Sequence, residues 1–256
     1  MRPAAAVAAC ALLTACATAG GPLPSPTVSG YLDAAAVEAM AKGFGTPPPS
    51  PTQWTGDPHP PSNRWWLAIA HAELRPPEAA QHFDCALGTR LAAKPRPALT
   101  RMMNRLLVDS AAVAARMAEL HPRSRPIAAD GELQPCQRID PATRDTPSWP
   151  AAAAVAGAAY GEMFAELAPD RAEAARFIGA EVGRSRAVCR MNWPQDVEAG
   201  QSVGQQVYES AREDADFRAD LEAARAELVA ARAEGLTSPA CAAERRALGP
   251  MPGEVR

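Results

Sequence analysis

Three short segments of the 256-residue chain carry side chains suited to holding an oxyanion. Arg125 stands before Pro126 after a long helical pattern, Ser148 lies in TPSWP, and Ser185 opens SRAVCRMNWPQD, which includes Arg186. Guanidinium groups make charge-assisted hydrogen bonds with phosphate oxygens, and a serine at a helix start adds a hydroxyl and backbone N–H groups. The chemistry that these residues predict is the binding of phosphate or another small anion.

In order and spacing, the three segments resemble the motifs of the bacterial class A non-specific acid phosphatases, in the phosphatidic acid phosphatase type 2/haloperoxidase superfamily. The family pattern is K-x6-R-P, then P-S-G-H, then S-R-x5-H-x3-D. The resemblance extends from about Tyr31 to Leu228 and includes LTRMMNRLLVDSAAVAAR before the first motif. It implies an all-α, single-domain helical bundle of the acid phosphatase/vanadium haloperoxidase type.

The resemblance also implies roles for individual residues. In the family, a third-motif histidine attacks phosphorus, the following aspartate orients it, and the second-motif histidine protonates the leaving oxygen. Lysine, two arginines and the Ser-Gly amides hold the phosphate. Carried onto this chain, Arg125, Ser148 and Arg186 are the anion-binding residues, and Asp196 is the retained orienting carboxylate.

Four motif positions depart from the family pattern. Ala118 replaces the lysine, Trp149 the glycine, Pro150 the acid histidine and Asn192 the nucleophile. An amide is neither a nucleophile nor a base, proline cannot donate a proton, and loss of a nucleophile costs about 10³–10⁶-fold in rate. The sequence therefore predicts a pseudophosphatase with no intact catalytic set and a residual anion-binding or structural role. An active acid phosphatase (a phosphomonoester hydrolase) with a non-standard site is the alternative, and a purely structural lipoprotein is a third.

The state of the former catalytic pocket has two interpretations. Trp149 fills or narrows it, which we favour, with the arginines paired to Asp196 or to glutamates. Alternatively, Arg125 and Arg186 hold an anion, with Arg184 and Arg190 as further cations nearby. His121, four residues before Arg125, is the histidine nearest to the motifs in the sequence.

Helices must position these residues. Alanine is abundant and aromatic residues make up 5% of the chain, which favours helices over sheets. Apolar residues at three- and four-residue steps predict a helix over 97–120. Further helices are expected over 31–42, 63–74, 78–92, 148–167, 170–186 and 196–233, with loops at 44–63 and 127–147.

The N-terminus predicts export. MRPAAAVAACALLTAC has an early positive charge and a short apolar run, and its last four residues resemble a lipobox that places a lipid on Cys16. We expect a lipoprotein-type signal peptide over 1–16, a tether over 17–30, an acid-phosphatase-like domain over 31–235 and a tail over 236–256. This predicts a periplasmic protein anchored to the outer membrane through its lipid, with a plain secretory signal as the alternative.

Four cysteines remain after the signal, an even number that favours disulfides in an oxidising compartment. Three pairings are open; we favour Cys136 with Cys189, which would tie the first and third motifs together, and Cys85 with Cys241. No metal motif or cofactor is expected. The net charge of −3 with no basic run argues against nucleic acid, and the sequence indicates no particular protein partner.

Overall fold

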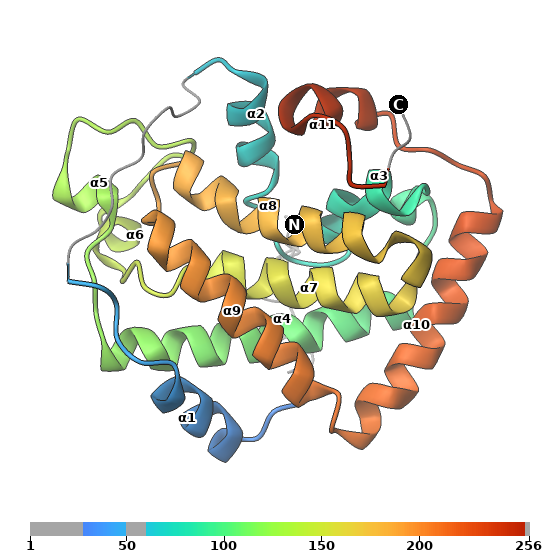
Figure 1. The fold of residues 1–256 in the computed structure, drawn as a ribbon, viewed down its shortest axis with the longest axis horizontal. Helices are drawn as coiled ribbons and strands as arrows, with labels where there is room; N and C mark the ends of the chain where they lie inside the picture. The colour runs from blue at the N-terminus through green and yellow to red at the C-terminus, as the bar shows by residue number, and fades with distance from the viewer. Residues whose placement is uncertain (1–27, 50–59, 254–256) are drawn as a thin grey trace, which may run out of the picture.

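The computed structural model describes residues 28–49 and 60–253, and across these ranges its regular structure is helical, without a β-strand (Figure 1). The predicted all-α, single-domain fold is confirmed. The predicted signal peptide, Cys16 and most of the tether lie outside the described residues. The α-helices are α1 (Ala34–Gly43), α2 (Asn63–Ala70), α3 (Asp84–Leu87), α4 (Pro97–Leu120), α5 (Pro126–Ala129), α6 (Pro141–Asp145), α7 (Ala152–Leu167), α8 (Ala172–Val188), α9 (Pro194–Ala211), α10 (Ala215–Ala233) and α11 (Cys241–Leu248). Three short 3₁₀ helices are η1 (Glu78–Phe83), η2 (Leu91–Ala93) and η3 (Pro169–Arg171).

Helix α7 is the centre of the fold, with α4, α8 and α9 packed around it (Figure 1). Its sequence, AAAVAGAAYGEMFAEL, is apolar on almost every face, as expected of a helix enclosed by neighbours. Small side chains dominate its first half, so α8 and α9 approach its backbone closely. Larger apolar side chains, including Tyr160 and Phe164, fill the core at its other end.

Two glycines form the closest contact between α7 and α8. A Cβ atom placed on Gly179 would lie 2.4 Å from the carbonyl oxygen of Gly157. We expect Gly179→Ala to force the two helices apart and to lower the free energy of unfolding by about 1–3 kcal/mol, measured by urea denaturation. Gly43→Ala is the matched control, because nothing lies within 4 Å of its Cβ position at the end of α1. Equal stability of the two variants would contradict this account.

Several helix boundaries differ from the sequence prediction for local reasons. The segment 78–92 is broken at Gly88, which adopts a φ of +66° and ends α3. The helical region expected over 196–233 consists of two helices, α9 and α10, and Asp214 caps the N-terminus of α10 with its side chain. Two short helices, α5 and α6, lie in the predicted loop 127–147. The helix over 97–120 has the predicted limits.

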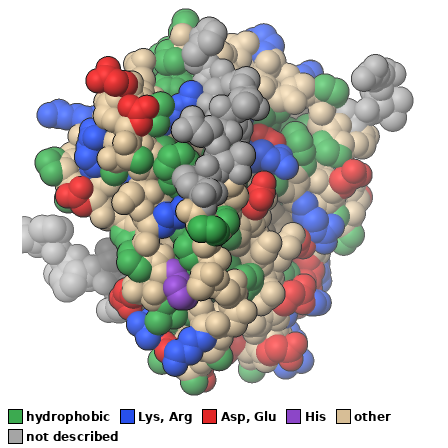
Figure 2. Space-filling model, turned by 60° about the vertical axis from the view of Figure 1, so that its left-hand side comes forward, with side chains coloured by type: hydrophobic (Ala, Val, Ile, Leu, Met, Phe, Trp, Pro, Cys, Tyr) green, Lys and Arg blue, Asp and Glu red, His purple; other side chains and the backbone are tan. Residues whose placement is uncertain are grey.

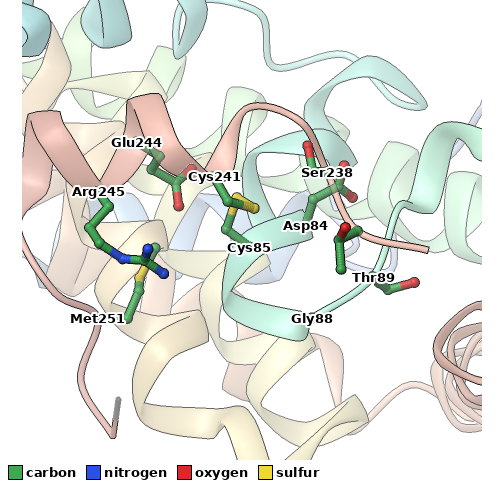
Figure 3. Close-up of a pocket in the computed structure, with 10 residues that line it drawn as sticks. Asp84, Cys85, Gly88, Thr89, Ser238, Cys241, Glu244, Arg245 and Met251 are labelled. Atoms are coloured by element: carbon green, nitrogen blue, oxygen red, sulfur yellow. A yellow bond between two sulfur atoms is a disulfide. The ribbon is translucent and has the colours of Figure 1, made fainter. Parts of the chain in front are cut away.

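The expected disulfide pairing is confirmed. Cys136 is bonded to Cys189, and Cys85 is bonded to Cys241. The second bond joins α3 to the start of α11, beside a small pocket that also contains the buried Asp84 (Figure 3). The segment 236–253, expected to be a tail, therefore contains a helix that is covalently fastened to the domain and packs against α2.

Within the described residues, no helix combines the length and the apolar character needed to cross a membrane.

Candidate anion site

The residues of the three sequence motifs surround a pocket of about 420 Å³, which we call the arginine pocket. Helix α4 forms one wall, the start of α7 another, and the end of α8 a third. Arg125 and Arg186 enter it from different segments, and Asn192, Ala118 and Pro150 also line it. The remaining lining residues are mostly apolar: Ala72, Leu74, Ala111, Ala114, Ala115, Gln137, Pro147, Ala152 and Ala153.

Both arginines in this pocket are held by neutral groups. Arg125 donates from Nη1 to the Met191 carbonyl oxygen at 2.7 Å and from Nε to Thr146 Oγ1 at 3.0 Å. Arg186 donates from Nη1 to Gln137 Oε1 at 3.3 Å. Among residues 28–49 and 60–253, no carboxylate forms an ion pair with either guanidinium group. Two cations thus share one pocket, and neither is ion-paired with a carboxylate of the described residues.

Burial lowers the pKa values of both pocket arginines. Burial, together with the charge of Arg125, lowers the pKa of Arg186 to about 10. Burial also lowers the pKa of Arg125, although the charge of Asp196 acts in the opposite direction. Both groups remain charged at neutral pH, and a bound anion would relieve the cost of keeping them so. The pocket therefore holds two positive charges in a partly desolvated setting.

Asn192, at the position of the family nucleophile, has a structural hydrogen bond. Its Nδ2 donates to the Ser148 carbonyl oxygen at 2.6 Å, and the residue is only 4% exposed. The amide therefore links the loop after α8 to the segment that leads into α7. Because an amide nitrogen has no lone pair available for attack, this side chain holds the pocket wall and performs no covalent chemistry.

Asp196 forms a buried ion pair with Arg123. Arg123 donates from Nη1 to Asp196 Oδ1 at 2.8 Å, and the carboxylate is fully buried. The hydroxyl of Ser148 donates to Asp196 Oδ2 at 2.5 Å, and the backbone N–H of Trp193 donates to the same oxygen at 3.2 Å. Burial raises the pKa of Asp196, and the hydrogen bonds from Ser148 and Arg123 act against this rise. The orienting carboxylate is thus part of the framework.

Two of the expected roles are not realised in this arrangement. Ser148 is fully buried with its hydroxyl on Asp196, so the structure does not bring it into the arginine pocket. Asp196 pairs with Arg123, so the expected pairing of Asp196 with the pocket arginines is wrong. Cysteine pairing, in contrast, holds the first and third segments together as expected.

Trp149 does not fill the pocket, so the interpretation that we favoured from the sequence is wrong. Its side chain is 2% exposed and packs in a separate core cluster with Val113, Met117 and Val203. His121 lies edge-to-face against the indole, with 5.8 Å between the ring centroids. The histidine nearest to the motifs in the sequence is therefore a packing neighbour of Trp149 and does not line the arginine pocket.

The other cations near the third segment lie outside the pocket lining. Arg184 is half exposed and pairs with Glu181 one turn earlier in α8. Arg190 is likewise absent from the lining. Figure 2 turns the end of the molecule with α5 and α6 toward the viewer and shows basic, acidic and apolar side chains interspersed there. The two pocket arginines are thus a local pair rather than part of an extended basic surface.

Sequence reasoning missed Arg123 and Gln137. Residues 122–125 have no helical structure, and in extended backbone alternate side chains point to opposite sides. Arg123 and Arg125 accordingly face different targets, Asp196 and the pocket. This two-residue alternation in HPRSRPI is a signal that could have separated the framework arginine from the pocket arginine.

Comparison with known proteins finds relatives that are named acid phosphatases. The chain is 32% identical to an acid phosphatase of Zymomonas mobilis over 177 residues, which is 69% of this chain and 67% of that protein. The chain belongs to the bacterial class A acid phosphatase family. It is also 29% identical to a non-specific acid phosphatase of Salmonella typhimurium and 25% identical to one of Providencia stuartii, over 58% and 65% of those proteins and 56% and 62% of this chain. No protein-family model matches the chain.

Membership of the acid phosphatase family draws attention to the arginine pocket, because the motif segments meet there. Of the two disulfides, the bond between Cys136 and Cys189 ties the first of these segments to the third. Family membership fixes the ancestry and the fold, whereas activity depends on the side chains present. In this member of the family, the pocket has two guanidinium groups but no histidine among its lining residues.

Proposed function

We propose that this member of the acid phosphatase family is a pseudophosphatase that binds phosphate or a similar small oxyanion in the arginine pocket without hydrolysing phosphomonoesters. The observation that carries the proposal is the pair Arg125 and Arg186 in one pocket, with no ion-paired carboxylate among the described residues. The positive charge and the hydrogen-bond donors of the two arginines suit an oxyanion. The apolar walls limit the access of water, which would otherwise weaken the attraction between the arginines and the anion.

The absence of catalysis follows from the groups at the two reactive positions. Covalent phosphoryl transfer through this site would require a nucleophile at position 192 and a proton donor at position 150. Asn192 and Pro150 supply neither, and Ala118 adds no positive charge. An active acid phosphatase with a non-standard site remains the second candidate, since family relatives are named as such.

We also place the protein in the periplasm, held at the outer membrane by a lipid on Cys16. The sequence LTAC at residues 13–16 carries this part of the proposal. The two disulfides support it, because such bonds persist in oxidising compartments. Attachment at the N-terminus would leave the arginine pocket free to meet small anions in the envelope.

Anion binding can be measured by titrating phosphate, and separately vanadate, into the mature domain by calorimetry and tryptophan fluorescence. We expect saturable binding, and we expect Arg125→Ala or Arg186→Ala to weaken it about 10–100-fold, because each removes charge-assisted hydrogen bonds. Arg184→Ala is the matched control, since that arginine pairs with Glu181 outside the pocket.

Each outcome of this titration distinguishes one candidate. Loss of binding in both pocket variants, with Arg184→Ala unchanged, would support the proposal. No binding by the wild-type domain would favour a purely structural lipoprotein. Phosphate release from a phosphomonoester that depends on Arg125 and Arg186 would favour the active enzyme.

A further inference from the structure

A second pocket, of about 520 Å³, lies between α2, η1 and α11, and we call it the histidine pocket. His71 and His82 both line it, and the exposed indole of Trp66 forms part of its wall. The histidine pocket and the arginine pocket share no lining residue. They are neighbours in the chain, because His71 and Glu73 line the histidine pocket whereas Ala72 and Leu74 line the arginine pocket. The chemistry of the two pockets is therefore separate.

The hydrogen bonds around Ser185 favour one tautomer of His71. The Ser185 hydroxyl donates to the Glu181 carbonyl oxygen at 2.8 Å, so its oxygen must accept from its other neighbours. It accepts from Arg64 Nη1 at 2.8 Å and contacts His71 Nδ1 at 2.8 Å. His71 Nδ1 therefore carries the proton, and Nε2 of the neutral ring is left as a bare acceptor.

The acceptor atom of His71 is buried and unsatisfied. His71 is fully buried, and Nε2 has no hydrogen-bond partner among the residues that the structure describes. Burial, together with the nearby His82 and Arg64, holds the pKa of His71 well below its usual range. A buried acceptor without a donor carries a desolvation cost, and a donor supplied by a ligand would remove that cost.

The rest of the histidine pocket favours a cation. Glu73, Glu78 and Glu244 are among its described lining residues, which include no lysine or arginine, and Glu73 is already paired with the exposed Arg75. His82 donates from Nε2 to the Glu73 carbonyl oxygen at 2.7 Å, and burial lowers its pKa, so it adds no charge at neutral pH. The indole of Trp66 is 59% exposed and offers an aromatic face, to which ammonium groups are attracted.

From these contacts we infer that the histidine pocket binds a small organic ammonium ion with an apolar body. Its N–H donates to Nε2 of His71, its positive charge lies near Glu78, and its apolar part rests against Trp66. The site is independent of the anion proposed for the arginine pocket. Of the residues that the inference uses, only Ser185 belongs to a phosphatase-like motif, and it acts through His71.

The probe is phenethylammonium, compared with two isosteres: neutral 2-phenylethanol and anionic 3-phenylpropionate. Calorimetry on the full domain at neutral pH is expected to show saturable binding of the ammonium ion that exceeds the binding of both isosteres. Trp66→Ala should weaken it about threefold to fivefold. Glu78→Gln should also weaken it, whereas Val229→Ala, at an exposed apolar site on α10, should have no effect.

A direct readout avoids replacing His71, whose loss could disturb folding. Long-range ¹H–¹⁵N spectra report each histidine nitrogen, and the His71 Nε2 resonance should move upfield when phenethylammonium donates to it. An unmoved resonance, equal binding to the Trp66→Ala variant, or equal affinity for either isostere would overturn the inference. Phosphate titration of the same samples follows the arginine pocket, so failure at one site is distinguished from failure at the other.

Discussion

The purified mature domain is expected to hydrolyse p-nitrophenyl phosphate, between acid and neutral pH, at least about 10³-fold more slowly than an acid phosphatase with both histidines, because both covalent and proton-transfer steps lack their groups. Pro150 and Asn192 line the pocket where those groups would act. The measurement is release of p-nitrophenol, with the Arg125→Ala/Arg186→Ala double variant as a control for contaminating phosphatase.

Restoring the nucleophile alone should not restore turnover. In Asn192→His the new imidazole would replace an amide that donates to the Ser148 carbonyl oxygen, and no residue at position 150 would protonate the leaving group. Asp196 would also be engaged already by Arg123 and Ser148. Wild-type turnover that disappears in the Arg125→Ala and Arg186→Ala variants would contradict the pseudophosphatase proposal. Substantial turnover by Asn192→His would show that the proton donor is dispensable.

Asp196→Ala is expected to lower the free energy of unfolding by about 3–5 kcal/mol, because it leaves the buried Arg123 guanidinium without its partner. The substitution also removes the acceptor for Ser148 Oγ and for the Trp193 backbone N–H. Urea denaturation measures the loss. Asp145→Ala is the matched control, since Asp145 is an exposed aspartate at the end of α6.

A double-mutant cycle separates the stranded charge from the other losses at Asp196. The variant Arg123→Ala/Asp196→Ala should be more stable than the sum of the two single effects implies, because neither charge is then left unpaired. Strict additivity of the two substitutions would argue that Asp196 stabilises the fold through Ser148 and Trp193 and not through Arg123. A loss no larger than that of Asp145→Ala would contradict the role of Asp196 in the framework.

The features that were predicted correctly from the sequence depend on the types and the spacing of a few residues. Apolar spacing over 97–120 predicted the limits of α4, and family-like spacing predicted that Arg125 and Arg186 approach one pocket. The disulfides followed from an even number of cysteines together with their places beside the motifs. In each case the signal is contained in the types and separations of a few residues.

What sequence could not predict depends on the direction of individual side chains. Trp149 points into the core because apolar side chains of α4, α7 and α9 surround it there, and its position in the motif carries no such information. Ser148 turns to Asp196, and Ser185 turns to His71 and Arg64, and neither lines the arginine pocket. Long-range contacts between different helices decide these directions.

The two disulfides are nested, since the bond from Cys136 to Cys189 lies within the segment closed by Cys85 and Cys241. During synthesis from the N-terminus, Cys85 and Cys136 emerge first, and at that moment they are the only two of these four cysteines available to each other. A bond between them would be non-native. Correct assembly in an oxidising compartment therefore requires either that α7 and α8 are complete before any bond closes, or that an early wrong bond is exchanged. The two cysteines of the domain that are synthesised first are thus not partners in the folded protein.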